Sequence, residues 1–271
     1  MRKTVTIALS LLLVGTFFVG ASLAADTLDT VKARGVLIAG VKDSLPPFGY
    51  IDQKTRTIVG YDIDFVKEIA KRLGVKVELK PVTSATRMPQ LQEGNIDIIA
   101  ATMTKNAERA KVIDFSDTYF LTGQKFLTKT GTVKSLEDLA GKKIGTTKGS
   151  TSEKNAAKAV PTATILSFDD YPQAVLALTQ GKVAAVTTDE SILAGLLAKL
   201  PKGQYEIPDI RISDEPYGLG IQKGNPKFLK FVNQTLLEME KSGEAKKIFD
   251  RWFGPDTDTP MKRDFTITAD K

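Results

Sequence analysis

The sequence predicts an α/β protein with two lobes and a ligand cleft between them. Apolar runs of strand length alternate with segments of helical periodicity from residue 36 to residue 253, which is typical of parallel sheets with helices on both faces. A helix–glycine–strand unit also occurs twice, at 91–102 and at 178–189, although any unit of this kind would look similar and common ancestry stays open. The units carry Thr102 and Asp189 at the carboxyl ends of their strands, where open α/β sheets bind ligands. Two such sheets facing each other would form a cleft.

Periodicity and glycine positions place each element along the chain. Residues 36–41 form a short apolar strand that leads into a loop with two consecutive prolines. The segment 61–73 places its apolar residues at helical spacing, and Gly74 ends it. Further strands are expected at 75–79, 96–101, 124–128, 143–147, 164–168, 183–188 and 218–222, and further helices at 88–92, 152–159, 172–180, 190–200, 226–241 and 244–253.

The N-terminal residues 1–24 have the features of a secretory signal peptide. Arg2 and Lys3 precede an apolar run from 5 to 19, and Ser22-Leu23-Ala24 offers the small residues that a signal peptidase reads. The run is shorter than the roughly 20 residues that a spanning helix needs. Because no cysteine follows the cleavage site after Ala24, lipid attachment there is excluded, and we expect a soluble periplasmic chain.

The amino-acid composition excludes several kinds of catalytic and metal-binding chemistry. The 271 residues include no cysteine, so neither disulfides nor a thiolate nucleophile are available, and no histidine, the commonest metal ligand and general base. We therefore expect no metal and no cofactor, while catalysis by carboxylates, lysine or tyrosine stays open. Removing Arg2 and Lys3 leaves 36 basic against 32 acidic residues, a net charge of +4 instead of +6. The basic residues are dispersed, so we expect no nucleic-acid partner.

Five segments in order resemble the family 3 periplasmic solute-binding proteins of ABC transporters, the polar amino-acid receptors. They are GVKDSLPPF at 40–48, GYDIDFVKEIAKRLG at 60–74, TMTKNAERAKVIDFSDTYF at 102–120, LEDLAGKKIGTTKGSTSE at 136–153 and SGEAKKIFDRWFG at 242–254. The stretch TSATR at 83–87 and Lys42 are most similar to the glutamate/aspartate-binding branch.

The resemblance implies the type II periplasmic-binding-protein fold, in which each lobe is a mixed sheet flanked by helices. Lobe 1 would comprise residues 25–119 and 214–271, and lobe 2 residues 120–213, with crossovers near Thr118–Thr122 and Ile210–Glu215. It also implies a monomer without enzymatic activity that binds an amino acid and delivers it to a membrane permease. The polar tail after residue 253 is expected to be a short extension.

Two charged residues match the family positions for the ligand backbone. Arg109 matches the arginine that grips the α-carboxylate, for which a guanidinium fork is suited. The alternative is a solvated arginine at a helix start, a position that the helix dipole disfavours. Asp189 matches the acid that accepts the α-ammonium, and its alternative role is to cap the helix that begins at Glu190.

Five uncharged residues match further contact positions. Thr102 and Thr104 match groups that offer carbonyl or hydroxyl oxygens, and Thr104 could also cap the helix carrying Arg109. Thr147 and Ser150 match contacts at a helix N-terminus, a favourable seat for a carboxylate. Ser150 also has the spacing of a capping box with a glutamate three residues later. Tyr171 matches a position that can reach the ligand, although it could instead pack within the lobe.

Selectivity is expected from Lys42, Ser84 and Arg87. In the family branches that bind lysine or arginine, the position of Lys42 looks like an acid. By charge complementarity, a cation at this position favours a ligand with an acidic side chain. With Arg109 the cleft would hold three cations against Asp189, and another acid or solvent must compensate one charge. Lys42 and Arg87 could instead be surface charges. Neutral polar amino acids, a cyclohexadienyl dehydratase-type enzyme and a detached sensory domain are the alternative functions.

Overall fold

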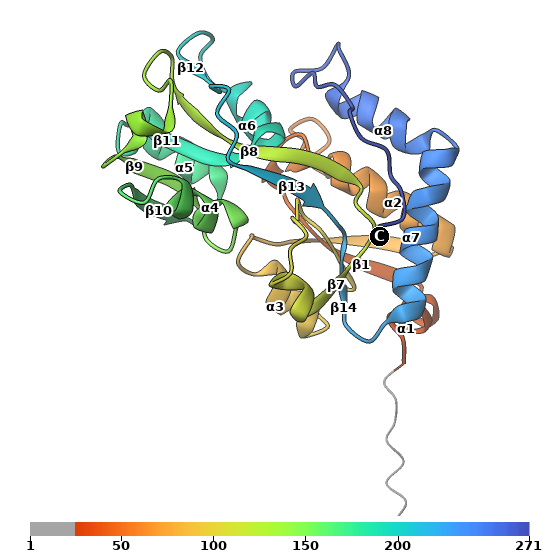
Figure 1. Ribbon diagram of the computed structural model, residues 1–271. Helices are drawn as coiled ribbons and strands as arrows, with labels where there is room; N and C mark the ends of the chain where they lie inside the picture. Colours follow the sequence, from red (N-terminus) through yellow and green to blue (C-terminus); the bar gives the residue numbers. More distant parts are fainter. Residues whose placement is uncertain (1–24, 271) are drawn as a thin grey trace, which may run out of the picture.

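The computed structural model describes residues 25–270 and divides them into two sheet-rich lobes flanked by helices (Figure 1). This confirms the predicted fold class. The predicted signal peptide, 1–24, lies outside the described residues. Within 25–270 no helix is both long enough and apolar enough to cross a membrane.

The first lobe is built on a five-stranded sheet. In the order β5-β1-β6-β14-β7, the strands are Lys76–Pro81, Val36–Val41, Ile98–Ala100, Gly220–Gln222 and Ile113–Phe115. The first three are parallel, whereas β14 is antiparallel to both of its neighbours. Helices α1 (Thr27–Arg34), α2 (Tyr61–Leu73), α3 (Arg87–Gln92), α7 (Pro226–Lys241) and α8 (Glu244–Phe253) belong to this lobe, with a small sheet of β2 (Ser44–Leu45), β3 (Gly49–Ile51) and β4 (Ile58–Val59).

The second lobe is built on a six-stranded sheet. Its main order is β10-β9-β11-β8-β12, with strands Thr164–Phe168, Lys143–Thr147, Ala185–Asp189, Phe120–Lys129 and Tyr205–Glu206, and β13 (Ser213–Tyr217) also pairs with β8. Helices α4 (Thr151–Ala159), α5 (Tyr171–Thr179) and α6 (Glu190–Leu197) pack against this sheet. Strand–helix alternation alone indicated parallel strands, but β8 runs antiparallel to β11, β12 and β13, so the sheet is mixed, as the resemblance implied.

The antiparallel pair β8 and β13 carries the chain between the lobes. Phe120 pairs with Tyr217 and Gln124 pairs with Ser213, so the two crossings lie side by side (Figure 1). They lie where crossovers were expected, while the lobe boundaries at 119/120 and 213/214 stay a prediction. Two adjacent strands thus connect the lobes, and this pair is called the hinge.

An aromatic cluster packs beneath this hinge. The ring of Phe120 lies 5.1 to 6.1 Å from six others, centroid to centroid; they belong to Phe48, Tyr61, Tyr217, Phe249, Phe253 and Phe265. Phe265 belongs to the segment after α8, which was expected to be a mere extension. That segment is instead fastened to lobe 1, since Arg263 forms an ion pair with Glu240 and Ile267 is buried.

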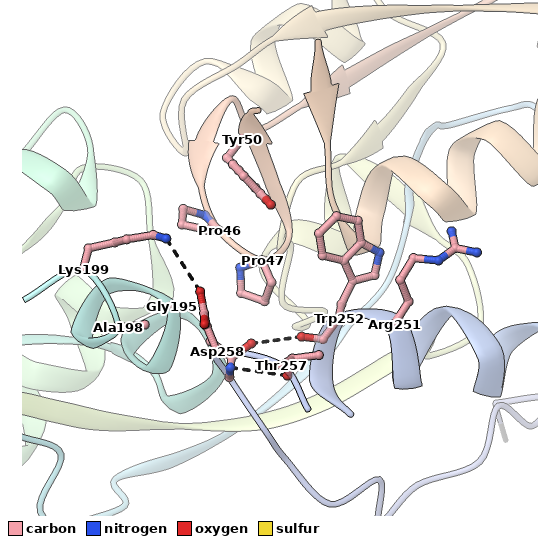
Figure 2. Close-up of a pocket in the computed structure, with 11 residues that line it drawn as sticks. Pro46, Pro47, Tyr50, Gly195, Ala198, Lys199, Arg251, Trp252, Thr257 and Asp258 are labelled. Atoms are coloured by element: carbon pink, nitrogen blue, oxygen red, sulfur yellow. Dashed lines mark hydrogen bonds and ion pairs between the residues drawn. The ribbon is translucent and has the colours of Figure 1, made fainter. Parts of the chain in front are cut away.

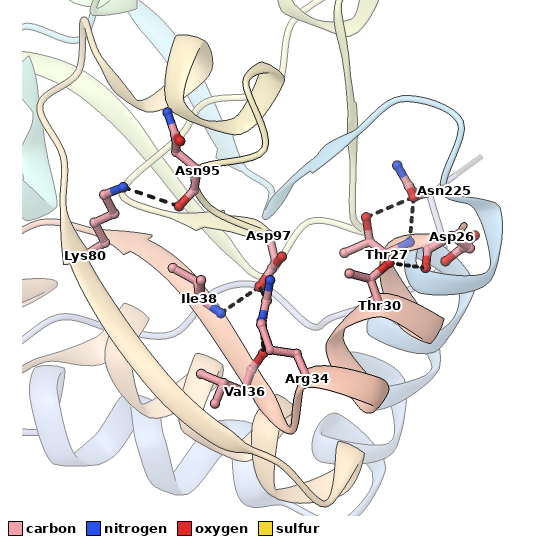
Figure 3. Close-up of polar contacts among 10 residues, drawn as sticks. All are labelled: Asp26, Thr27, Thr30, Arg34, Val36, Ile38, Lys80, Asn95, Asp97 and Asn225. Atoms are coloured by element: carbon pink, nitrogen blue, oxygen red, sulfur yellow. Dashed lines mark hydrogen bonds and ion pairs between the residues drawn. The ribbon is translucent and has the colours of Figure 1, made fainter. Parts of the chain in front are cut away.

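Helix α1 was not predicted, and polar contacts hold it in place (Figure 3). The backbone N–H of Thr27 donates to the Asn225 side chain at 2.7 Å. Arg34 pairs with Asp97, whose carboxylate also accepts the N–H of Ile38 in β1 at 2.7 Å. Because α1 buries only one apolar residue, its sequence carries no apolar periodicity that would have revealed it.

Candidate functional site

Arg109 lies between the two lobes and touches both. Its Nη1 donates to the carbonyl of Thr104 in lobe 1 at 2.8 Å, and its Nη2 donates to the carbonyl of Gly149 in lobe 2 at 3.0 Å. The side chain is buried, which rules out the solvated alternative. Arg109 begins a 3₁₀ turn, Arg109–Lys111, instead of an α-helix, and its N–H is accepted by the Asn106 side chain at 2.8 Å. The suggestion that Thr104 caps a helix here was therefore wrong.

Asp189 ends β11 on the facing lobe. It occupies the N-cap position of α6, yet its side chain makes no capping hydrogen bond, so the capping alternative was wrong. One carboxylate oxygen accepts the hydroxyl of Tyr217, and Oδ1 has no partner among the described residues. Burial, followed by the negative charge of Glu215, raises the pKa of Asp189 to about 7. A cationic group bound at Oδ1 would favour the ionised form.

The loop between β9 and α4 supplies polar groups beside Arg109. Ser150 donates from Oγ to the Thr147 carbonyl at 2.7 Å instead of capping α4, and Glu153 accepts from Ser167, so the predicted capping box was wrong. The hydroxyl of Thr147 is buried and has no partner among the described residues. Across the cleft, Thr104 Oγ1 lies 3.5 Å from Thr151 Oγ1. The hydroxyl groups of both lobes therefore converge near the guanidinium.

Lys42, Ser84 and Arg87 form a buried group in lobe 1, which overturns the surface-charge alternative. Lys42 Nζ donates to Ser84 Oγ at 3.0 Å. Arg87, 2% exposed, donates from Nη1 to the carbonyls of Thr102, at 3.1 Å, and Ala101. Its Nε has no partner within residues 25–270. Burial, followed by the charge of Arg87, lowers the pKa of Lys42 well below its ordinary value. Burial, followed by Arg109, lowers the pKa of Arg87 to about 9.

Tyr171 takes the packing role that was expected as one of its two alternatives. It starts α5, is buried and belongs to the main apolar core, as the packing alternative required. The contact of Tyr171 with the ligand stays a prediction.

Two buried acids were missed from the sequence. Asp62 in α2 is fully buried and lies electrostatically close to Lys42 and Arg87. Glu215 in β13 accepts from Thr151 Oγ1 at 2.8 Å and gives the largest electrostatic support to the charge of Arg109. Asp62 lies on the buried face of α2 among apolar residues. An acid at such a position in a helix is costly to bury without a partner, and this could have identified Asp62 from the sequence. The sequence left one positive charge without an assigned acid, and the structure places two acids near the cations: Asp62 near Lys42 and Arg87, and Glu215 near Arg109.

The lobes touch along the edges of this site. Gly149 approaches the backbone of Ser84 and Ala85 so closely that a Cβ atom would lie 2.9 Å from the Ser84 carbonyl oxygen. A groove of about 330 Å³, lined in part by Arg109, Ser150 and Lys154, marks one mouth of the cleft. The lobes are therefore closed on each other.

On another side, α6 meets the proline loop, and a cavity of about 190 Å³ lies between them and α8 (Figure 2). A Cβ atom on Gly195 would lie 1.9 Å from the Pro46 carbonyl oxygen. Lys199 and Asp258 form an ion pair at 3.9 Å at its edge (Figure 2). This cavity contains none of the predicted site residues.

No set of three or more His, Cys, Asp or Glu side chains within 25–270 is grouped to hold a metal ion. The absence of metal and cofactor stays a prediction. Two lobes on a two-stranded hinge, closed over buried charges of both signs, define a binding protein for a small charged molecule.

The matched family narrows this class. Residues 37–255 match the family model described as bacterial extracellular solute-binding proteins, family 3. The chain belongs to this family and is an amino-acid-binding protein associated with an ABC transporter.

Curated relatives differ in the ligand that they are named for. The chain is 40% identical to the ABC transporter glutamine-binding protein GlnH of Bacillus subtilis, over 85% of this chain and 86% of the relative. It is 42% identical to a glutamine-binding protein of Geobacillus stearothermophilus, over 78% and 81%. It is 37% identical to a glutamate/aspartate import solute-binding protein of Salmonella typhimurium, over 86% and 82%.

Solved structures share the fold. A mutant of the arginine-binding protein of T. maritima superposes with a TM-score of 0.79 at 34% identity, covering 84% of this chain and 99% of that one. An ancestral arginine-binding protein bound to glutamine gives 0.78 at 43% identity, covering 82% and 99%. An ancestral amino acid-binding protein, AncCDT-1, described as a precursor of cyclohexadienyl dehydratase, gives 0.78 at 38% identity, covering 84% and 99%.

Proposed function

We propose that this protein is a monomeric periplasmic receptor for an acidic amino acid, glutamate or aspartate, which it delivers to a membrane permease. The observation that carries the proposal is the pair of buried basic side chains, Lys42 and Arg87, which lie close enough to interact electrostatically. Burying two cations together is unfavourable unless anions pair with them. Asp62 provides one negative charge, and the side-chain carboxylate of the ligand would provide the second.

The ligand backbone would bind at the centre of the cleft. Arg109 would hold the α-carboxylate with Thr104, Thr147 and Ser150 as hydrogen-bonding neighbours, and Asp189 would accept the α-ammonium through Oδ1. Thr102 and Tyr171 would complete the walls. Support comes from two buried atoms that have no hydrogen-bond partner within residues 25–270, Asp189 Oδ1 and Thr147 Oγ1, since buried polar groups in proteins are normally hydrogen-bonded.

Closure follows from the position of these groups on both lobes. The ligand would dock on lobe 1 through Arg109 and Thr104, and lobe 2 would then bring Asp189 and the 147–151 loop. Bending at β8 and β13 is the hinge motion expected for such a protein. The permease would then recognise the closed form.

A glutamine receptor is the second candidate. The 40% and 42% identical relatives are named as glutamine-binding proteins. The lowered pKa of Lys42 also favours a neutral amine, which can hydrogen-bond an amide without requiring a charge. The charge state of Lys42 separates the two candidates. With Lys42 charged, the Lys42–Arg87 pair keeps one positive charge beyond that of Asp62, which suits an acidic ligand; with Lys42 neutral it keeps none, which suits an amide.

Titration of L-glutamate, L-aspartate, L-glutamine and L-asparagine by calorimetry tests the proposal, after a thermal-shift screen of the twenty amino acids. We expect tighter binding of the acids, and we expect Lys42→Met to lose that preference. Lys199→Met is the matched control, since Lys199 is 65% exposed in its ion pair and lies away from the predicted site residues. Tighter binding of an amide by the wild type would establish the second candidate, and stabilisation by lysine or arginine alone would refute both.

An enzymatic function is a further alternative, because AncCDT-1 is described as a precursor of a dehydratase. Incubation with prephenate or arogenate, with detection of an aromatic product, distinguishes an enzyme from a receptor. We expect no product.

A further inference from the structure

Asp62 lies at the first turn of α2 with both carboxylate oxygens engaged. Oδ2 accepts the backbone N–H of Thr102 at 2.9 Å, and Oδ1 accepts the hydroxyl of Tyr119 at 2.7 Å. The side chain is fully buried. Two donors directed at two oxygens match a carboxylate anion, which accepts hydrogen bonds and donates none.

Thr102 has an unusual backbone conformation. Its φ is 48°, and among the described residues only Arg56 is another non-glycine with positive φ. A β-branched residue rarely adopts this left-handed region, because its side chain crowds the backbone. The N–H of Thr102 is held by Asp62, and its carbonyl accepts from Arg87 Nη1 at 3.1 Å. Asp62 and Arg87 thus hold one strained residue from opposite sides.

Asp62 also adds a negative charge beside the two buried basic side chains, Lys42 and Arg87. Burial raises the pKa of Asp62 to about 6, while the hydrogen bonds from Tyr119 and Thr102 and the positive charges of Arg87 and Lys42 favour its ionised form. The negative charge of Asp62 in turn opposes the lowering of the Lys42 pKa by burial and by Arg87. When Lys42, Arg87 and Asp62 are all ionised, the three side chains leave one net positive charge. One ligand carboxylate neutralises that charge, whereas an amide does not.

We propose that Asp62 is a positioning and specificity-determining residue, which presupposes the acidic-ligand site proposed above. Its hydrogen bond keeps Thr102 in the left-handed conformation at the cleft, and its charge reduces the Lys42–Arg87 pair to a single positive charge.

The test replaces the acid by its amide, Asp62→Asn, and measures Kd for L-glutamate and L-glutamine by calorimetry. The amide NH₂ cannot accept a hydrogen bond, so we expect both ligands to bind about tenfold more weakly, the size of one lost charge-assisted hydrogen bond. Because the cation pair is then uncompensated, the ratio of the glutamine Kd to the glutamate Kd should rise by at least about threefold.

Thr102→Gly separates positioning from charge, since glycine adopts positive φ without steric cost. In that background Asp62→Asn should weaken binding less than in the wild type, while the rise in the Kd ratio should persist. Asp64→Asn is the matched control, because Asp64 lies in the same turn but bonds Arg251 and Trp252 at 2.7 and 2.8 Å. It should leave the Kd ratio unchanged.

Several results would overturn the role of Asp62. One is that Asp62→Asn leaves both Kd values unchanged. Another is that Asp62→Asn weakens both ligands equally, and by the same factor in the Thr102→Gly background as in the wild type. Should Asp62→Asn fail to fold, the double variant carries the test, and its failure to fold would equally overturn the positioning role. A wild type that prefers glutamine would refute the acidic ligand alone, and the change in the Kd ratio would still decide the role of Asp62.

Discussion

Replacing Arg109 by alanine tests the centre of the site. The guanidinium is buried, hydrogen-bonded to carbonyls of both lobes and, on our proposal, paired with the ligand α-carboxylate. Removing one partner of a buried charge pair costs about 2–5 kcal/mol, largely because the other charge stays buried without a partner. Losing the bond to Gly149 removes a further charge-assisted contact of the closed form, typically ~1.5–3 kcal/mol.

These contributions overlap, since binding and closure are coupled, so we expect a loss of at least ~3 kcal/mol, or about 100-fold in Kd. Calorimetric titration with L-glutamate measures it, with circular dichroism to establish that the variant is folded. The control is Lys154→Ala, because the Lys154–Glu108 ion pair is also between lobes but each side chain is 71% exposed. An exposed pair is worth about 0–1 kcal/mol. Arg109→Ala binding within tenfold of the wild type would refute the assignment.

Three further predictions concern closure, pH and the hinge. Gly195→Ala should weaken ligand binding about tenfold, because the added methyl group overlaps the Pro46 carbonyl and overpacking of this kind costs ~1–3 kcal/mol. Gly145→Ala is the control, because its Cβ would make only ordinary contacts, and it should leave the affinity unchanged. Equal affinities of the two variants in calorimetry would contradict this prediction. The pKa of Asp189 is raised from 3.8 to about 7, so between these values the folded carboxyl keeps a proton that the unfolded chain has lost. The unfolding free energy of the ligand-free protein should therefore fall by up to ~4 kcal/mol as pH rises through this window, and Asp189→Asn should reduce this dependence on pH. Denaturant titrations at about pH 4 and pH 7 measure it. An equal change in unfolding free energy between the two pH values in wild type and variant would disprove the prediction. Phe120→Ala should destabilise the fold by ~3–5 kcal/mol, measured by chemical denaturation, and a loss below 1 kcal/mol would show that the aromatic cluster does not support the hinge.

Local patterns predicted most of the fold. The apolar periodicity of 61–73 and 226–241 indicated α2 and α7, and both formed with these bounds. Helix α1 and the short strands β2 to β4 were missed, because they are too short or too polar to show a period. Local patterns did not indicate strand direction, since the antiparallel course of β8 depends on pairing with residues as distant as Tyr217, 97 positions from its partner Phe120.

The site residues likewise show what local sequence indicates and what only contacts between distant residues reveal. A helix start followed by an acid suggested capping at Ser150 and Asp189, and neither side chain caps its helix. Ser150 bonds the carbonyl of Thr147 three residues away instead. The partner of Asp189 cannot be seen in the local sequence, because the hydroxyl of Tyr217 reaches it from the second crossover strand. Glu215 escaped notice for the same reason, because its closeness to Arg109 exists only after both crossovers have formed.

The sequence by itself determined the order of elements, the placement of polar residues at strand ends and the family to which the chain belongs. Those features are local or are carried by short motifs, so they can be read without knowing which segments meet. The tertiary structure decided that Lys42 and Arg87 are buried, that Asp62 and Glu215 accompany them, and that Arg109 touches both lobes. Burial and charge pairing depend on contacts between distant segments, and these contacts set the electrostatics that choose a ligand.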